Sequence, residues 1–124
     1  MRIASVIAVF LGFTGVALGA FGAHGLKDLV SPAMLEVWKT AVSYQMYHVL
    51  VTLVVSLCPA LQASRAATAA AACFTVGIII FSGSLYALVA FNMPGLGMVT
   101  PIGGALFLLG WLVLAVALLR RSGA

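Results

Sequence analysis

Charged residues are missing from three long stretches of this 124-residue chain. No Asp, Glu, Lys or Arg occurs in residues 3–26, 40–64 or 66–119. A charged side chain at the centre of a bilayer costs about 2.5–3.5 kcal/mol even on a lenient insertion scale, so segments that cross the hydrocarbon exclude charge. The third stretch is long enough for two crossings with a neutral turn between them. The sequence therefore predicts an all-α membrane protein that folds as a four-transmembrane-helix bundle.

The composition supports a membrane protein. Hydrophobic residues make up 65% of the chain and charged residues 6%, against about 45–50% and 25% in soluble domains. Four spans leave no room for a second globular unit, so residues 1–124 are interpreted as a single membrane domain. The formal net charge is +4, but no basic run with interleaved aromatics occurs. The basic residues therefore favour contact with anionic lipid headgroups, and nucleic acid is not an expected partner.

The predicted spans cover about residues 3–23, 39–57, 67–91 and 101–119. The first could be mistaken for a cleaved secretory signal, but its apolar run of about 20 residues exceeds the roughly 7–15 of such signals, so we expect it to be retained. Ser31 and Pro32 are typical of an N-cap and a first helical position, so the second helix should begin before its span. Residues 92–95, with sequence NMPG, should end the third helix.

Basic residues are unevenly divided between the two sides of the membrane that this topology defines. One side holds four arginines and no acid: Arg2, Arg65, Arg120 and Arg121. The other side holds two lysines and both acidic residues: Lys27, Lys39, Asp28 and Glu36. The positive-inside rule then predicts cytoplasmic N- and C-termini. We expect the chain to lie in a bacterial inner (plasma) membrane as a multi-pass protein.

Small residues follow one face of the first span: Ser5, Ala8, Gly12, Gly15, Gly19 and Gly22. Their alternating steps of three and four keep them on one side of a helix. A smooth face lets another backbone approach closely, which is how membrane helices associate without a hydrophobic driving force. Gly12, Gly15, Gly19 and Gly22 are therefore predicted helix-packing positions. Because the chain is short, we expect homo-oligomerisation to bury this face.

The second span is the least apolar, with Tyr44, Gln45 and His48 among its polar residues. Such a polar sector must face protein or water, because unsatisfied polar groups facing lipid are costly. His48 should lie near the bilayer midplane. It has two interpretations: a neutral imidazole bonded across helices, or a proton-accepting or ligand-binding group in a cavity. The first is favoured.

Further candidate polar residues lie in the third span and at the outer helix ends. Ser82, Ser84 and Tyr86 occur in the third span, but G-x-S-x-G is absent, and membrane serines usually bond locally or across helices. Lys39 should pair with Glu36 on its own helix. His24 is expected to be a cap or loop contact, although a small outer site with Tyr44 is conceivable.

Metal and cofactor sites are not predicted, because two histidines 24 residues apart are a weak signal. Trp38 and Trp111 are interpreted as interface or packing anchors rather than as cofactor stackers.

Five motifs follow one another along nearly the whole chain: FGAHGL at 21–26, WKTAVSYQMYH at 38–48, FSGSLY at 81–86, TPIGG at 100–104 and LGW at 109–111. In this order they resemble the domain of unknown function 423 family, whose eukaryotic relatives are called transmembrane protein 256-like. The resemblance implies a small four-helix integral membrane protein. It implies no particular biochemical activity.

Three function classes are compatible with these features. The favoured one is a non-catalytic scaffold, accessory subunit or lipid-binding component, because a packing face is present and a catalytic constellation is not. The second is a small transporter or channel with a polar path through the second span, lined by His24, Tyr44, Gln45 and His48. The third, least favoured, is an intramembrane enzyme. The expected partners are the lipid bilayer and either a second copy or another membrane protein.

Overall fold

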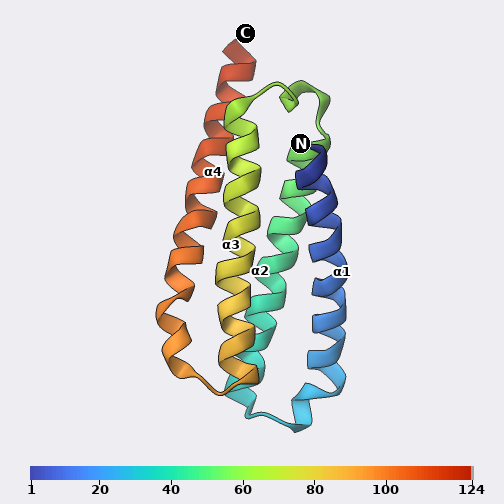
Figure 1. Ribbon diagram of the computed structural model, residues 1–124, viewed down its shortest axis with the longest axis vertical. Helices are drawn as coiled ribbons and strands as arrows, with labels where there is room; N and C mark the ends of the chain where they lie inside the picture. The colour runs from blue at the N-terminus through green and yellow to red at the C-terminus, as the bar shows by residue number, and fades with distance from the viewer. Residues whose placement is uncertain (124) are drawn as a thin grey trace.

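The computed structural model describes residues 1–123 as four long helices joined by short connections. The helices are α1 (Arg2–His24), α2 (Pro32–Leu57), α3 (Arg65–Ala90) and α4 (Thr100–Gly123), and the connections hold the 3₁₀ turns η1 (Leu26–Asp28), η2 (Pro59–Leu61) and η3 (Pro94–Met98). The helices run alternately up and down, so both termini lie at the same end of the molecule (Figure 1). The all-helical prediction is confirmed.

All four helices are long and apolar enough to cross a membrane. Their best windows have mean hydropathies of 2.2, 1.3, 2.0 and 2.5 in chain order, and α2 with its polar cluster is the lowest. The predicted spans fall within these helices, except that α3 ends one residue earlier, at Ala90. Because α2 begins at Pro32, its first two turns precede the predicted span, as the sequence indicates.

Local chemistry sets the helix ends. Ser31 caps α2, its side chain accepting a hydrogen bond from the Met34 N–H at 3.2 Å, with Pro32 as the first helical residue. Ser64 caps α3 in the same way through the Ala67 N–H at 3.1 Å. These caps satisfy backbone donors that would otherwise lack partners in the first helical turn.

The end of α3 is a Schellman motif built on Asn92. Its φ of 51° makes it the one non-glycine residue with positive φ among residues 1–123, a conformation that asparagine tolerates better than most residues. The Met93 N–H reaches back to the Leu88 carbonyl at 3.0 Å. The chain thereby turns sharply into η3, and Pro94 cannot continue the helix.

The helices pack mainly against their neighbours in sequence, α1 on α2, α2 on α3 and α3 on α4. In the view of Figure 1, α1 and α4 lie at opposite edges of this array. Helix α1 is the least enclosed, with 11% of its span window buried against 39% for α2 and for α3. Helices α2 and α3 therefore form the centre of the fold.

Large apolar side chains cover the outward faces of all four helices, for example Phe13, Leu50, Ile79 and Leu112, each more than half exposed. A soluble monomer rarely exposes so much contiguous apolar surface. Hydrocarbon solvates it without cost, and each helix satisfies its own backbone hydrogen bonds, as a bilayer requires.

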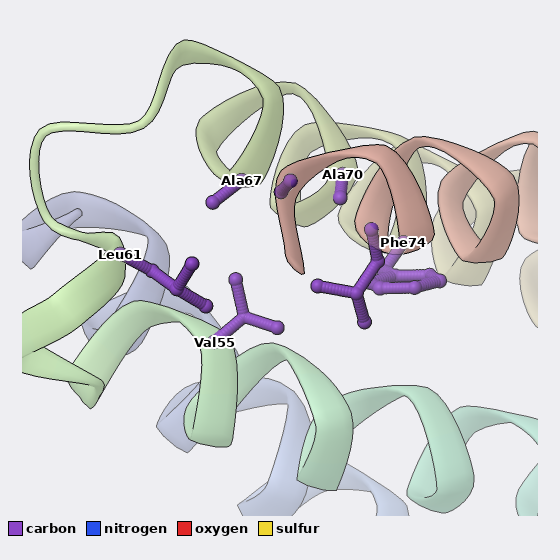
Figure 2. Close-up of a cluster of buried hydrophobic side chains, with 7 residues drawn as sticks. Val55, Leu61, Ala67, Ala70 and Phe74 are labelled. Carbon is purple, nitrogen blue, oxygen red and sulfur yellow. The ribbon is translucent and has the colours of Figure 1, made fainter. Parts of the chain in front are cut away.

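The end that holds both termini has a tightly packed apolar core, shown in Figure 2. Its buried residues are Val55, Leu61, Ala67, Ala70, Phe74, Leu114 and Ala117. The alanines of α3 leave room for α4 to approach, and Leu61 carries the α2–α3 connection into the core. This end is therefore well ordered by side-chain packing as well as by the helix caps.

The small-residue face of α1 packs against α2 of the same chain. A Cβ on Gly22 would lie 2.6 Å from Cδ1 of Trp38, and one on Gly15 would lie 2.5 Å from Sδ of Met46. Gly12 and Gly19 likewise face the side chains of Val49 and Val42, at 3.4 and 3.2 Å from an added Cβ. Burying this face therefore does not require a second copy, which removes the reason given above for expecting oligomers.

Helices α3 and α4 approach even more closely, again at glycines. A Cβ on Gly103 would collide with the backbone of Phe81. A Cβ on Gly77 would lie 2.6 Å from the Phe107 ring, and one on Gly110 would lie 2.7 Å from the Phe74 ring. Close backbone contact of this kind is the principal packing device available to helices in lipid.

We expect Gly103→Ala to destabilise the protein by about 2 kcal/mol, because the added methyl group must push α4 away from the α3 backbone. Equilibrium unfolding in mixed micelles measures this. Gly83→Ala is the matched control, since nothing lies within 4 Å of a Cβ at this helical position. It should be neutral or stabilising by up to about 1 kcal/mol. Equal destabilisation by both substitutions would contradict the packing described.

Candidate functional site

Gln45 of α2 is the centre of a polar cluster that joins three helices. Its amide nitrogen donates to the Leu11 carbonyl at 2.7 Å and to Oγ1 of Thr14 at 3.1 Å, both on α1. Its amide oxygen accepts from the hydroxyl of Tyr86, on α3, at 2.6 Å. The side chain is 2% exposed. Every polar atom of Gln45 is thus used to hold α1, α2 and α3 together.

Trp38 joins α2 to the half of α1 that lies nearer the α1–α2 connection. Its indole N–H donates to the Leu18 carbonyl at 2.8 Å, and the ring fills the space left by Gly22. The ring also lies against Tyr86 and Phe21, with centroid separations of 4.8 and 5.9 Å. Trp38 is therefore a buried packing anchor between helices.

His48 lies about one helical turn after Gln45 and links α2 to α4. Its Nδ1 is 2.7 Å from the Tyr44 carbonyl, and its Nε2 is 3.2 Å from the indole N–H of Trp111. The first contact needs an N–H on Nδ1 and the second needs a lone pair on Nε2, which together select one neutral tautomer. The ring stacks on Phe107 at 3.6 Å and is 5% exposed.

Two serines of α3 make further bonds between elements. Ser82 donates to the Ala41 carbonyl of α2 at 2.7 Å, and it is buried. Ser84 lies 2.6 Å from the hydroxyl of Thr100 at the start of α4. The hydrogen-bond partners of the two serines are backbone carbonyls and the Thr100 hydroxyl, so both serines act as interhelical hydrogen-bonding groups.

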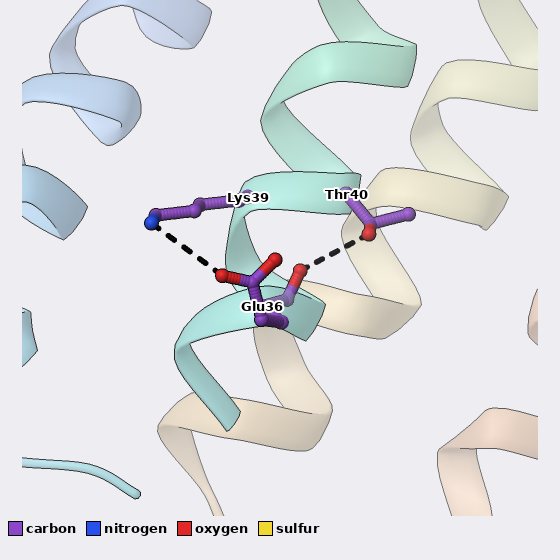
Figure 3. Close-up of polar contacts among 3 residues, drawn as sticks. All are labelled: Glu36, Lys39 and Thr40. Carbon is purple, nitrogen blue, oxygen red and sulfur yellow. Dashed lines mark hydrogen bonds and ion pairs between the residues drawn. The ribbon is translucent and has the colours of Figure 1, made fainter. Parts of the chain in front are cut away.

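His24 and Lys39 lie on the exposed surface, away from this cluster. Nδ1 of His24 is 2.9 Å from the Ala20 carbonyl of its own helix. Lys39 pairs with Glu36 at 3.5 Å, and both side chains are more than half exposed (Figure 3). Thr40 donates to the Glu36 backbone carbonyl at 3.0 Å. These are local helix contacts of low energy.

Tyr44 and Tyr47 of α2 are both exposed at the protein surface. Tyr44 packs its ring against Phe81 at 4.9 Å but is 41% exposed, and Tyr47 is 61% exposed. Within residues 1–123, neither phenol hydroxyl has a hydrogen-bond partner in the protein, and the same holds for the neighbouring Ser43 hydroxyl. We call Ser43, Tyr44 and Tyr47 the outer α2 face.

The sequence-predicted residues therefore separate into three groups rather than one site. Gln45 and Tyr86 meet, whereas His48 bonds to α4, and His24 and Lys39 stay at the surface. Over the described part of the chain, each buried side-chain nitrogen and oxygen has a hydrogen-bond partner. Residues 1–123 hold no group of three His, Cys, Asp or Glu side chains able to bind a metal. The arrangement fixes helices in place.

Sequence reasoning did not identify two partners in these bonds, Thr14 and Trp111. Thr14 lies 31 residues from Gln45, and Trp111 lies 63 residues from His48. The usable signal was chemical: an indole N–H inside a membrane span needs an acceptor, and the second span contains an imidazole that can accept.

We expect Gln45 and Tyr86 to be coupled by about 1 kcal/mol in a double-mutant cycle of Gln45→Leu and Tyr86→Phe, near the range measured for interhelical bonds in membranes. Equilibrium unfolding in mixed micelles gives the free energies of unfolding of the wild type, the two single variants and the double variant. A cycle between Gln45→Leu and Thr75→Val is the control, because Thr75 bonds only to Ala71 on its own helix. Coupling near zero for the first pair would contradict the cluster.

His48 should be the neutral tautomer with its proton on Nδ1. Nitrogen-15 NMR of histidine-labelled protein in micelles distinguishes the two ring nitrogens, and His48→Asn assigns the signals. Trp111→Phe should perturb the unprotonated Nε2 resonance and leave His24 unchanged. A proton on Nε2 would be incompatible with the bond from Trp111.

Comparison with known proteins places this arrangement in a family. The model of a protein family described as "Protein of unknown function (DUF423)" matches residues 18–104, from the end of α1 to the start of α4. A UPF0382 membrane protein of Staphylococcus epidermidis is 42% identical over 99% of this chain and 100% of its own length. The UPF0382 membrane protein YwdK of Bacillus subtilis is 38% identical over 97% and 98%.

A third relative, a UPF0382 membrane protein of Haemophilus influenzae, is 44% identical over 84% of this chain and 83% of its own length. No solved structure matches. The resemblance found in the sequence motifs is confirmed. This chain is an integral membrane protein and belongs to the DUF423 family.

Proposed function

We propose that this protein is a non-catalytic helical component of the bacterial inner membrane that associates with a second copy through the outer α2 face. The polar side chains of the spans fall into two classes, those bonded within the protomer and those without a partner there. Gln45, His48 and Tyr86 are used inside the protomer, where they hold helices together. Ser43, Tyr44 and Tyr47 have hydroxyls without a partner in the protomer. The Tyr47 side chain is the most exposed of the three, whereas the Tyr44 ring also packs on Phe81 and Ser43 is half-buried beside α1.

The unpartnered hydroxyl of Tyr47 carries the proposal. Tyr47 lies eight residues after Lys39, or about 12 Å along the helix at 1.5 Å per residue. With a hydrocarbon core of about 30 Å, that depth is near the middle of the membrane. Lipid chains offer no hydrogen-bond acceptor, so a phenol exposed there is stabilised by a polar group from another protein surface. The same face on a second copy supplies three hydroxyls.

Charge supports cytoplasmic termini. The end of the molecule that holds both termini also holds all four arginines, Arg2, Arg65, Arg120 and Arg121, whereas Lys27 and Lys39 lie at the opposite end with both acids. By the positive-inside rule, this distribution supports an arginine end that faces the cytoplasm. The three relatives named above are bacterial proteins, and helical spans favour the inner (plasma) membrane of a bacterium.

A structural role is favoured over transport or catalysis by the burial of the two best polar candidates. Gln45 and His48 are 2% and 5% exposed, and their polar atoms are bonded to protein groups. A permeation path or a reaction would need them to meet water or a ligand.

The variant Tyr44→Phe/Tyr47→Phe should weaken self-association by about 5- to 30-fold, because two hydrogen bonds of roughly 0.5–1 kcal/mol each are removed while the rings remain. Single-molecule photobleaching in vesicles over a range of protein-to-lipid ratios gives the dissociation constant. Stability of the protomer should be unchanged.

Tyr86→Phe is the matched control. It also removes a phenol hydroxyl, but this hydroxyl donates to Gln45 inside the protomer. It should lower stability and leave association unchanged. A wild-type chain that stays monomeric at high protein-to-lipid ratio would refute the proposal, as would an unchanged dissociation constant in the double variant.

A further inference from the structure

A pocket of about 520 Å³ lies at the arginine end of the molecule, between the α2–α3 connection and the end of α4. Its lining includes three arginines, Arg65, Arg120 and Arg121, together with Ser64, Leu61 and Ala117. The volume is within the roughly 300–1,000 Å³ typical of small-molecule sites. Residues 55 positions apart in sequence thus meet around one concave surface.

The electrostatics of this pocket favour an anion. The only acidic side chains in the chain, Asp28 and Glu36, lie at the opposite end, and Glu36 is already paired with Lys39. In the described part of the chain, none of the three guanidinium groups has an ion-pair or hydrogen-bond partner. Three unpaired positive charges around one concave surface repel each other, and a bound anion relieves that repulsion.

The chemistry of the lining narrows the anion to one that carries a phosphate. Guanidinium groups offer paired N–H donors that match phosphate oxygens, and Ser64 adds a hydroxyl whose oxygen is already occupied by the Ala67 N–H, leaving its hydrogen free to donate. The floor is apolar, because Leu61 and Ala117 belong to the buried core of Figure 2. The arginines form a side that suits phosphate, and Leu61 and Ala117 form a side that suits hydrocarbon. Such a lining fits an amphipathic ligand.

The pocket also lies at the depth of the lipid headgroups. Arg120 and Arg121 directly follow the apolar run of α4, and Ser64 and Arg65 directly precede that of α3. Arginines at such boundaries interact with the phosphate layer. A phosphate at this depth comes either from an anionic phospholipid or from the adjoining aqueous phase.

We infer that this pocket is a binding site for one phosphate-bearing anion, held by Arg65, Arg120 and Arg121. The site is distinct from the outer α2 face and does not depend on self-association. It differs from general attraction to a charged membrane in requiring these three arginines rather than the total charge of the protein.

The six basic residues of the chain allow a charge-matched test. The pocket variant is Arg65→Gln/Arg120→Gln/Arg121→Gln, and the control variant is Arg2→Gln/Lys27→Gln/Lys39→Gln, so each loses three positive charges. Native mass spectrometry of the full chain, released from detergent micelles, counts bound phosphatidylglycerol and phosphatidylcholine. Circular dichroism checks that both variants are folded.

The wild-type chain should retain one phosphatidylglycerol in preference to phosphatidylcholine. The pocket variant should bind it at least about tenfold more weakly, whereas the control should change by less than about threefold. Equal losses in the two variants would overturn the inference, since charge alone would then explain binding. So would equal affinity of the wild type for the two lipids together with no binding of inorganic phosphate.

Competition with millimolar inorganic phosphate identifies the source of the anion. Displacement of the lipid supports a site that accepts free phosphate, and retention supports a site for the lipid headgroup. If the pocket variant does not fold, Arg65→Lys/Arg120→Lys/Arg121→Lys keeps the charge and removes the paired donors. This variant should bind severalfold more weakly than the wild type, and unchanged binding would overturn the inference.

Discussion

Hydrocarbon accepts no hydrogen bonds, and the packing of this protein follows from that constraint. A polar side chain buried inside a span must find its partner in the protein, and several of these partners lie on a neighbouring helix. Gln45, His48 and Trp38 all lie on α2, and they bond respectively to α1 and α3, to α4, and to α1. Helix α2 is the least apolar span because it carries these links for the whole bundle.

Glycine makes these links geometrically possible. A side-chain hydrogen bond between helices requires the helices to lie close together, and the surrounding lipid supplies no hydrophobic force to bring them there. Gly22 leaves the space in which the Trp38 ring reaches the α1 backbone, and Gly103 lets α4 touch the α3 backbone. The hydrogen bonds fix the relative orientation of the helices and the glycines let them approach closely, so we expect loss of either to weaken the packing.

The interior polar groups are satisfied within the protomer, which leaves function to the surface. Two surface features differ from the apolar faces of the helices: the outer α2 face and the arginine-lined pocket. We propose that the first offers hydroxyls to another protein surface and that the second offers guanidinium groups to a phosphate. Both suit a component that acts through association in the membrane, whereas the buried imidazole of His48 is enclosed by Phe107 and Trp111.

The sequence by itself determined the four helices, their ends at Ser31 and Asn92, and the family, because exclusion of charge from lipid and the chemistry of helix caps are local rules. It also drew attention to Gln45, His48 and Tyr86 as polar residues inside the spans, since any polar group in a span is conspicuous. Only the tertiary structure decided which residues meet: Gln45 with Tyr86, His48 with Trp111, and the glycine face of α1 with α2 rather than with a second copy. The physical reason is that periodicity fixes the face on which a side chain lies, whereas its partner depends on the rotation and neighbours of whole helices, which involve contacts up to 63 residues apart.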